Sequence, residues 1–390
     1  MPKVQVLLSG GVDSSVVASK LVEEGFEVSA VFLQCWSKNQ LTKLGLNQDL
    51  YACTWEDDAN DARLIAKKLQ IPFEILNLEQ EYLDYVVEYM LQEYIQGNTP
   101  NPDVMCNSEI KFGAFYKYVQ DFVATGHYAR KLNFRDSNYK AKKEFLEIED
   151  FDFIARSKDK KKDQSYFLWK LKKDQLAKIL FPAGEFNSKM ELREYAKTRD
   201  LITANKKDSQ GLCFIGKTPL RNLLATKFGL QTGKILDLNT NLVIGEHPGA
   251  FLYTIGQREK LGLSGGPWFV AKIDIKENLV YVVHNDQKEK LNKNQLKINS
   301  INLQVPNSFL QLISEKENQK YFLKILSQAR YHGEICEIKI NLEDLLEANY
   351  DPKKSVLVEF LNFVKSPAVG QSLVFYFDEI MLGGGVISEN

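Results

Sequence analysis

The first third of the chain alternates short apolar runs with longer stretches that carry apolar residues at helical spacing. Because strands that alternate with helices build parallel sheets covered by helices on both faces, this pattern predicts an α/β domain. Ligands of such domains bind at the carboxyl ends of the strands. The predicted strands are residues 4–8, 27–33, 73–76 and 122–125, and the predicted helices are residues 14–24, 58–69, 82–96 and 110–120.

Beyond about residue 217, short strands and glycine-containing turns replace this pattern, which predicts small β-domains and a barrel. Before that point, residues 174–180 and 189–200 have helical patterns, whereas residues 129–165 lack a regular pattern and are expected to be mobile. We therefore expect an N-terminal α/β domain with a parallel sheet (1–217), a small β-rich central domain (218–286) and a C-terminal β-barrel (287–390). The clearest late strands are 233–237, 280–283, 335–340, 356–360 and 373–377, the last one closed by the glycines at 383–385.

The overall composition adds few constraints. A chain of 390 residues is long enough for two or three domains, and 44% hydrophobic with 26% charged residues is ordinary for a globular protein. No apolar run approaches the roughly 20 residues that span a bilayer, and the N-terminus lacks the features of a signal or transit peptide. We therefore expect a cytoplasmic protein with no membrane partner.

The net charge of −1 gives no general sign of nucleic-acid binding, but the charge is unevenly distributed. Residues 130–173 contain 14 Lys and Arg against 8 Asp and Glu, and the densest run lies between Arg156 and Lys162. Such a run is usually a solvated loop. Basic clusters also attract phosphate backbones, so this segment is a candidate RNA contact.

The segment Ser9–Ser15, with the sequence SGGVDSS, lies between a predicted strand and a predicted helix. Glycines permit positive φ angles, and the free N–H groups of a first helical turn attract anions, so a phosphate is the expected ligand. A Walker loop would place a Lys after the glycines, whereas here Asp13, Ser14 and Ser15 follow. The loop resembles the SGGxDS loop of ATP-pyrophosphatases (the PP-loop), which transfer AMP to a substrate oxygen. The alternative is a Ser/Gly turn that merely caps a helix.

Five widely spaced cysteines with no C-x-x-C pair argue against a disulfide framework, a zinc site or another metal centre. Cys106 and Cys213 are flanked by turn and polar residues. Since reactive thiols favour partly exposed loop or helix-start positions, both are candidates for chemistry, and packing is the alternative. The sequence Asn101-Pro102-Asp103 predicts a helix start, which would place Asp103 and Cys106 on one face. Cys35, Cys53 and Cys336 are expected to pack or to have no role.

Taken together, these motifs resemble the tRNA-specific 2-thiouridylases of the MnmA type over nearly the whole chain. The matching blocks include NPDVMCN at 101–107, ATGHYA at 124–129, KDQSYFL at 162–168, GLCFIG at 211–216 and YTIGQR at 253–258. The NPDxxCN and GxCFIG blocks are more specific than the PP-loop, which alone indicates adenylation.

The resemblance implies that ATP adenylates O2 of the wobble uridine of a tRNA and that a cysteine persulfide then supplies sulfur. It implies Mg²⁺ as the counter-ion of ATP and a sulfur-donor protein, such as a cysteine desulfurase or a relay protein. By position, Cys213 carries the persulfide, Cys106 is the nucleophile and Asp103 is an acid or base near the target base. The implied nucleotide contacts are Leu7, Leu8, Ser9, Gly10, Gly11, Val12, Asp13, Ser14, Leu33 and Gly126, and the implied tRNA contacts are Asn101, Pro102, Asp103, Lys162, Asp163, Gln164, Arg330 and Tyr331.

The chain departs from this family pattern at three motif positions. Leu7-Leu8 replaces a Gly-Met pair, Leu33 replaces a Met, and His332-Gly333 replaces Arg-Gln. The last change removes one permanent charge from an implied tRNA contact. Two other functions remain open: another PP-loop enzyme that adds nitrogen, such as an amidotransferase-like synthetase or a lysidine synthase, and an RNA- or nucleotide-binding protein without catalysis. Neither needs two placed cysteines.

Overall fold

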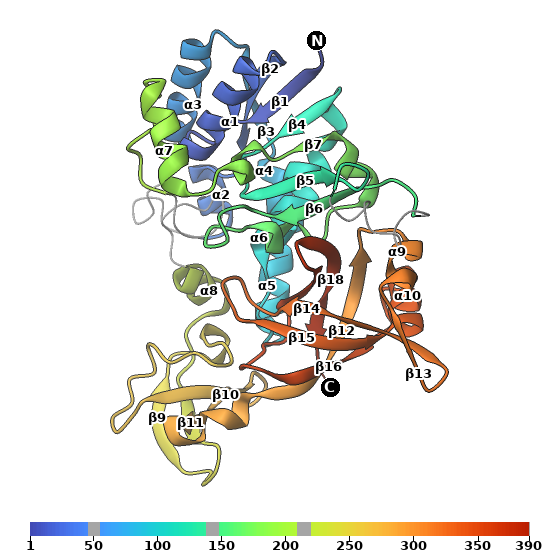
Figure 1. Cartoon of the computed structure of the whole chain (residues 1–390). Helices are drawn as coiled ribbons and strands as arrows, with labels where there is room; N and C mark the ends of the chain where they lie inside the picture. Colours follow the sequence, from blue (N-terminus) through green and yellow to red (C-terminus); the bar gives the residue numbers. More distant parts are fainter. Residues whose placement is uncertain (46–54, 138–147, 209–219, 390) are drawn as a thin grey trace.

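The computed structural model describes residues 1–45, 55–137, 148–208 and 220–389, and Figure 1 shows their arrangement. The N-terminal region is built on a five-stranded sheet in the order β3-β2-β1-β4-β7, in which every neighbouring pair is parallel. This confirms the α/β prediction. The strands are β1 (Lys3–Leu7), β2 (Glu27–Gln34), β3 (Phe73–Asn77), β4 (Phe122–Ala124) and β7 (Ile179–Leu180).

Both faces of this sheet are covered by helices. Successive residues of each strand point to opposite faces, so each strand contributes apolar side chains to two clusters. Leu8 and Phe32 pack with helices on one face, whereas Leu7 and Leu33 pack with helices on the other. The first face is covered by α1 (Val12–Glu23), α3 (Trp55–Leu69) and α7 (Lys189–Thr198). The second is covered by α4 (Glu79–Tyr82), a π-helical stretch (Leu83–Val87), α5 (Glu88–Ile95), α6 (Pro102–Met105) and a second π-helical stretch (Cys106–Ala114).

Two helix predictions in this region need correction. The helix expected at 110–120 begins eight residues earlier, at Pro102, and its π-helical part ends at Ala114. The prediction of a helix at 174–180 is wrong. Lys173–Lys178 forms a 3₁₀ segment, and Ile179–Leu180 is the edge strand of the sheet. Other short segments are α2 (Lys38–Lys43) and the 3₁₀ turns Tyr116–Tyr118, Ser165–Leu168 and Pro182–Glu185.

The central region is a small mixed sheet in the order β10-β11-β8-β9, with Ile235, Val270 and Val280 in its own core. It is preceded by a helix that the sequence pattern did not predict, α8. The bounds are α8 (Leu220–Phe228), β8 (Gly233–Asp237), β9 (Val243–His247), β10 (Trp268–Asp274) and β11 (Leu279–His284), with 3₁₀ turns at Ala250–Leu252 and Asn285–Leu291.

The C-terminal strands close into the expected barrel, because β12 pairs with β16 on one side and with β18 on the other. The glycines at 383–385 lie inside β18 and not in a turn. A Cβ on Gly383 would lie 2.0 Å from the carbonyl oxygen of Asn302, so only glycine lets the two strands approach here. The elements are β12 (Lys293–Leu303), α9 (Asn307–Leu312), β13 (Glu315–Glu317), β14 (Lys320–Gln328), β15 (Ile335–Asn341), α10 (Leu342–Tyr350), β16 (Val356–Val364), β17 (Ser372–Phe377) and β18 (Ile380–Ser388); α9 and α10 were not predicted.

The segment predicted to be irregular, 129–165, contains a β-hairpin that joins the first and last regions. Strands β5 (Ala129–Asn133) and β6 (Asp152–Arg156) pair with each other, and Ala155 pairs with Ile380 of the barrel. Phe153 and Ala155 are buried in the barrel core, while Ile154 belongs to the core beside the parallel sheet. Its local pattern gave no sign of this pairing, because the partner strand lies more than 200 residues away in sequence.

None of the helices in the described ranges combines the length and apolar character that crossing a bilayer requires.

Candidate active site

The loop Ser9–Ser15 leads from β1 into the first turn of α1, as predicted, and its own side chains hold it in shape. The hydroxyl of Ser14 accepts a hydrogen bond from the N–H of Ser9 at 3.1 Å, and the hydroxyl of Ser15 donates to the carbonyl of Gly11 at 2.8 Å. Gly11 begins α1 in an extended conformation without a side-chain cap. The N–H groups of the first turn are therefore oriented for an anion.

Glycine is required at two points of contact around this loop. Gly10 has a φ of +71°, and a Cβ there would lie 2.2 Å from the carbonyl oxygen of Asp58 in α3. A Cβ on Gly126, just after β4, would lie 2.9 Å from the backbone nitrogen of Ser14. The structure thus brings Gly126 against the loop, as expected for residues at the ends of adjacent parallel strands.

The apolar candidates Leu7, Leu8, Val12 and Leu33 are all buried, none being more than 8% exposed. Leu8 and Val12 pack under α1, whereas Leu7 and Leu33 lie in the cluster on the opposite face of the sheet. A bound nucleotide would therefore meet the backbone of Leu7, Leu8 and Val12.

Asp13 is the centre of a hydrogen-bond network that the sequence did not reveal. Its carboxylate accepts from the Nζ of Lys189 at 2.7 and 2.8 Å and from the hydroxyl of Tyr128 at 2.7 Å. Burial, and then the charge of Asp13, raise the pKa of Tyr128 far above its usual value, so the phenol stays protonated and donates. Lys189 is the first residue of α7, whose start is fixed by the Ser188 hydroxyl accepting from the N–H of Glu191.

A second carboxylate, Asp208, shares this lysine. The Nζ of Lys189 lies 2.9 Å from Asp208, which also pairs with Arg193 at 2.9 Å and with Lys162 at 3.1 Å. Burial alone would raise the pKa of the Asp208 carboxyl, but the hydrogen bonds and charges of Lys189 and Lys162 outweigh it and lower the pKa to about 2. Lys162, a predicted tRNA contact, is therefore part of the network around the loop.

Lys206 ties the loop to α3. Its Nζ donates to the carbonyl oxygen of Gly10 at 3.0 Å and to the carboxylates of Asp58 at 2.7 Å and Asp61 at 2.6 Å. Burial lowers the pKa of Lys206, but the two carboxylates more than compensate, so the net shift is upward. Lys189 and Lys206 lie more than 170 positions after the loop, so no local motif pointed to them. The one signal in the sequence was that the loop lacks a lysine of its own.

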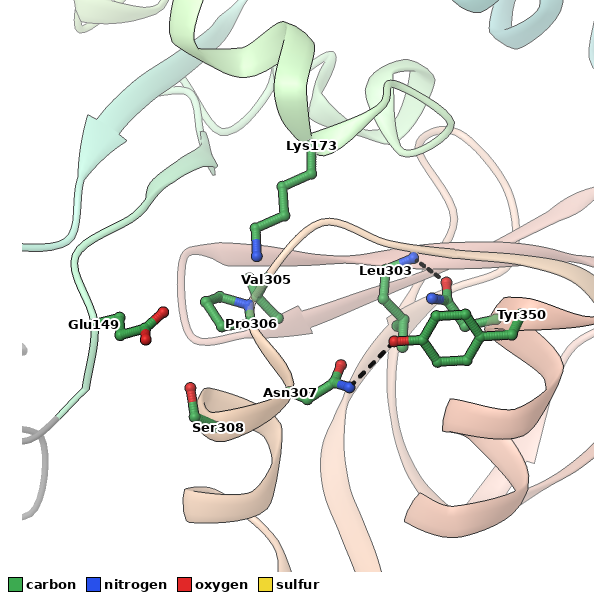
Figure 2. A pocket seen from close by; sticks show the side chains of 9 residues that line it. Glu149, Lys173, Leu303, Val305, Pro306, Asn307, Ser308 and Tyr350 are labelled. Atoms are coloured by element: carbon green, nitrogen blue, oxygen red, sulfur yellow. Dashed lines mark hydrogen bonds between the residues drawn. The ribbon is translucent and has the colours of Figure 1, made fainter.

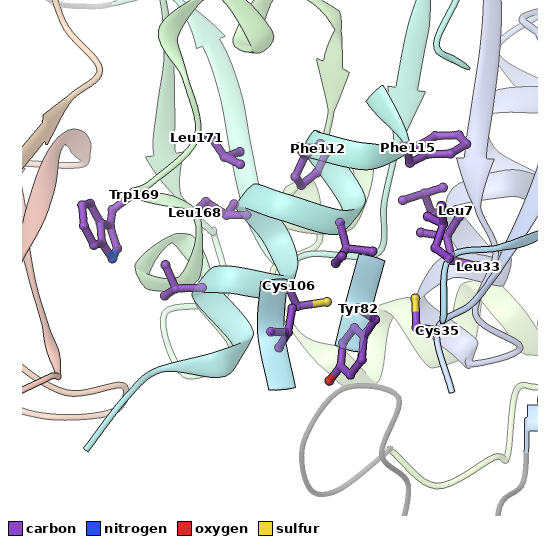
Figure 3. Close-up of a cluster of buried hydrophobic side chains, with 14 of the residues drawn as sticks. Leu7, Leu33, Cys35, Tyr82, Cys106, Phe112, Phe115, Leu168, Trp169 and Leu171 are labelled. Atoms are coloured by element: carbon purple, nitrogen blue, oxygen red, sulfur yellow. The ribbon is translucent and has the colours of Figure 1, made fainter. Parts of the chain in front are cut away.

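The motif at 101–107, which carries the candidate residues Asp103 and Cys106, begins a helix, as predicted. The side-chain oxygen of Asn101 accepts from the N–H of Val104 at 3.3 Å, Pro102 occupies the first turn, and the N–H of Cys106 bonds to the carbonyl of Asp103. The expected partial exposure of Cys106 is wrong: its side chain is 0% exposed. The helix continues past it and packs it on the core face, in the cluster that contains Leu33 and Cys35 (Figure 3).

Cys213 falls at 209–219, outside the described residues, as Cys53 does at 46–54. The predicted roles of Cys106, Cys213 and Asp103 remain predictions.

Of the predicted tRNA contacts, Asp163 and Gln164 serve internal hydrogen bonds. The carboxylate of Asp163 accepts from the N–H groups of Ser157 at 3.1 Å and Ser165 at 3.2 Å, and burial raises its pKa. The side-chain oxygen of Gln164 accepts from the N–H of Tyr128 at 3.0 Å. These two side chains therefore shape the segment after β6, and their predicted tRNA contacts remain predictions.

Arg330 and Tyr331 lie where the barrel meets the other two regions. The guanidinium of Arg330 donates to the carbonyls of Ile255, at 2.8 Å, and Ser366. The ring of Tyr331 lies 4.4 Å from that of Phe167, centroid to centroid. Burial raises the pKa of Tyr331 to about 12, helped by the charges of Asp163 and Asp103.

Phe167 also connects this aromatic group to the helix that carries Cys106. The side-chain amide of Asn107 donates to the carbonyl of Phe167 at 3.0 Å, and the ring of His332 lies 3.9 Å from Tyr331. The candidate residues therefore gather into two groups, one around the loop and Asp13, the other around the start of α6, Phe167 and Tyr331.

Magnesium was expected as the counter-ion of ATP. Within the described ranges, no three His, Cys, Asp or Glu side chains come together as a metal site. Asp13, the carboxylate of the loop, already accepts from Lys189 and Tyr128. A counter-ion held by the phosphates of ATP needs only one or two protein carboxylates, so the expected Mg²⁺ stays a prediction.

A hollow of about 510 Å³ lies elsewhere, between the segment at Lys173 and the barrel (Figure 2). Its wall includes Glu149, Asn307 and Tyr350, with the amide of Asn307 donating to the Tyr350 hydroxyl at 3.5 Å. None of the predicted site residues lines it, so it is separate from both groups.

Family models match three successive segments of the chain. They are described as a tRNA methyl transferase HUP domain (residues 2–217), a tRNA methyl transferase PRC-barrel domain (221–284) and an aminomethyltransferase beta-barrel domain (303–387). Together with the parallel sheet, the small mixed sheet and the closed barrel, these matches define a three-part tRNA-modifying class of protein.

Full-length relatives identify the family within this class. Proteins named tRNA-specific 2-thiouridylase MnmA are similar over 99% of this chain: 37% identical in Mycoplasma mycoides, 36% in Francisella tularensis subsp. novicida and 38% in Listeria monocytogenes, with 98%, 99% and 94% of those proteins covered. The domain descriptions mention methyl transfer, but they refer to single segments. The chain belongs to the tRNA-specific 2-thiouridylase MnmA family.

Proposed function

We propose that this protein is a tRNA 2-thiouridylase, which uses ATP to replace O2 of a wobble uridine by sulfur and releases AMP and pyrophosphate. The observation that carries the proposal is the placement of two chemistries on one sheet. A phosphate loop without a Walker lysine follows β1, and Leu33, near the end of the neighbouring β2, lies in the same buried cluster as Cys106. Membership of the 2-thiouridylase family supports it over the full length.

The proposed reaction has two stages, because the uridine O2 is a poor leaving group. In the first, O2 attacks the α-phosphorus of ATP, pyrophosphate leaves, and the uridine carries AMP. In the second, the terminal sulfur of a Cys213 persulfide attacks C2, and AMP leaves with the oxygen. The Cys106 thiolate then attacks Sγ of Cys213 and breaks the S–S bond, which leaves sulfur on C2 and a disulfide between the cysteines. An external thiol reduces that disulfide.

In this scheme the N–H groups of Gly10–Ser14 hold the phosphates, Ser9 contributes by holding the Ser14 hydroxyl, and Gly126 lets β4 close against the loop. Asp103 would act as acid or base at the target base. Arg330 and Tyr331, together with Lys162, would contact the tRNA. Mg²⁺ would arrive with the phosphates of ATP as their counter-ion, and no step is assigned to it. A sulfur-donor protein in the cytoplasm, such as a cysteine desulfurase or a relay protein, would load Cys213.

The test is to incubate the protein with ATP, Mg²⁺, a sulfur donor and unmodified tRNA, and then to analyse nucleosides and nucleotides. We expect one AMP and one pyrophosphate for each 2-thiouridine formed. Release of ADP and phosphate would overturn the PP-loop chemistry, and a nitrogen-containing product would favour the amidotransferase or lysidine alternative. Cys213→Ser should abolish 2-thiouridine while ATP and tRNA still bind; normal thiolation by that variant would contradict the persulfide assignment.

A further inference from the structure

We propose that Lys189 supplies, from another part of the chain, the phosphate-binding cation that the loop itself lacks. This inference deepens the proposed function and rests on it, since it concerns how the loop holds ATP. It assigns Lys189 to the outer phosphates, and it assigns the neighbouring Lys206 to holding the loop. The two lysines contact different residues of the same loop, Asp13 and Gly10, so each serves as a comparison for the other.

Lys189 is positioned by the fold at the opening of the loop. Its Nζ contacts both oxygens of Asp13, the second residue of α1, and lies over the ring of Tyr128 at 5.5 Å from the ring centroid. Its side chain is 14% exposed, so the ammonium group is held in a defined place without being closed off. The N–H groups of the first turn of α1 face the same opening, and a phosphate bound to them would lie beside this cation.

Both carboxylates around Lys189 have a second hydrogen-bond donor. If its ammonium group turns to a phosphate, Asp13 keeps the hydroxyl of Tyr128 at 2.7 Å. Asp208 keeps Arg193 at 2.9 Å and Lys162 at 3.1 Å. Asp208 therefore keeps two cations, and Asp13 keeps a neutral hydrogen-bond donor, so the exchange removes the charge partner of one carboxylate and leaves neither without a hydrogen bond.

Lys206 is bound in a way that opposes such an exchange. In the described part of the chain it is the one cation paired with Asp58 and Asp61, and its third hydrogen bond goes to the carbonyl of Gly10 in the loop. Turning Lys206 towards a ligand would leave two neighbouring carboxylates without their cation and would release the loop. Lys206 is therefore a positioning residue, and Lys189 is the exchangeable one.

The charge balance supports the same division. The network has as many carboxylates as cations, so an incoming triphosphate must take a cation from a carboxylate. Of the two lysines that contact the loop, Lys189 is the one whose carboxylates both keep another hydrogen-bond donor. The members are the four cations Lys162, Lys189, Arg193 and Lys206 and the four carboxylates Asp13, Asp58, Asp61 and Asp208.

The experiment measures calorimetric binding of ATP, pyrophosphate and AMP to the full-length protein and its variants. Lys189→Gln should weaken ATP and pyrophosphate binding about ten- to hundred-fold, as expected for the loss of a charge-assisted hydrogen bond, and should change AMP binding less than about two-fold. Lys206→Gln should lower the melting temperature and weaken all three ligands together. Lys197→Gln, an exposed lysine of the same helix, is the control for charge.

Equal losses for ATP and AMP in Lys189→Gln, or no loss, would overturn the assignment. If Lys189→Gln fails to fold, Asp13→Asn/Lys189→Gln is compared with Asp13→Asn, because this pair leaves no carboxylate at position 13 uncompensated. The double variant should still lose ATP selectively, and equal ATP binding by the two would refute the proposal. A wild-type protein that binds no ATP would instead sink the proposed function itself.

Discussion

The two groups of candidate residues are built in opposite ways. The loop is lined by serines, glycines and a network of ion pairs, and the side chains that surround its opening remain partly exposed. Cys106, by contrast, is 0% exposed in an apolar cluster with Leu33 and Tyr82. The loop therefore presents polar groups at a partly exposed opening, whereas the thiol lies inside an apolar core.

The largest expected effect is a loss of activity at the cysteine group that leaves ATP binding at the loop unchanged. Cys106→Ala should lower 2-thiouridine formation by about a thousand-fold or more, because it removes the proposed nucleophile, while ATP binding stays within about two-fold. Alanine is chosen because serine would bury a hydroxyl in an apolar cluster, whereas the smaller alanine costs about 1–2 kcal/mol of stability. Nucleoside mass spectrometry and calorimetry measure the two quantities. Cys35→Ala, at a thiol in the same cluster, is the control and should keep activity.

The next effect acts on the loop. Gly10→Ala should lower the melting temperature and weaken ATP binding at least ten-fold, because its Cβ would lie 2.2 Å from the carbonyl oxygen of Asp58 at a φ of +71°. Gly25→Ala, at the far end of α1, is the matched control. Gly25 has a φ of +84°, but no atom of the described residues lies within 4 Å of its added Cβ. Gly25→Ala should lower the free energy of unfolding by only the about 1–2 kcal/mol that a left-handed backbone costs a non-glycine residue, and it should bind ATP normally.

Equal losses in the two glycine variants would show that backbone conformation, and not the contact with α3, limits the loop.

These two sites also show which features a sequence can predict. The loop and the start of α6 depend on neighbours within a few residues, such as the Asn101 cap and the serines at 9 and 14, and both were predicted. The burial of Cys106 was not, because it depends on how the helix continues to Ala114 and packs on the sheet. Lys189 was missed for the same reason: its partner Asp13 is 176 residues away.

The barrel follows the same rule. Its strands were visible as short alternating runs, but its closure through β12 and β18 and its junction with β6 depend on contacts between distant segments. The three-glycine run at 383–385 was expected to close the strand at 373–377, whereas it lies in β18 and allows close packing between strands. Local pattern thus predicts elements, and the approach of distant backbones decides how glycines are used.

A pH experiment tests whether the ion pairs of Asp208 beside the Ser9–Ser15 loop stabilise the folded protein. Its pKa is lowered from 3.8 to about 2, so the stabilisation by Lys189 and Lys162 is present above about pH 4 and is lost as the pH falls towards 2. Asp208→Asn should therefore melt lower than the wild type at pH 7, and the difference should shrink between pH 4 and pH 2. Thermal melts across this range measure it. Asp136→Asn, on an exposed turn, controls for charge, and a constant difference for Asp208→Asn would contradict the prediction.

The smallest expected effect concerns the basic run Arg156–Lys162. Its last residue, Lys162, shares Asp208 with Lys189 beside the loop. Most of this run is already paired: Lys158 with Glu185 at 2.8 Å, Lys160 with Glu379 at 2.6 Å, and Lys162 with Asp208 at 3.1 Å. Lys161 is exposed and has no ion pair within the described residues. An unpaired cation can release a phosphate counter-ion without first giving up a carboxylate, so it contributes more to RNA binding than a paired one.

Lys161→Gln should therefore weaken tRNA binding about two- to five-fold and reduce the slope of log affinity against log salt concentration by about 1. Lys158→Gln should change both quantities less, because Lys158 is already neutralised by Glu185 and would have to give up that carboxylate before it could bind a phosphate. Titrations at several salt concentrations measure the slopes, and ATP binding should be the same in both variants. Identical slopes for Lys158→Gln and Lys161→Gln would mean that pairing does not decide which lysines meet the RNA. An unchanged slope in both would assign the whole run to a solvated surface.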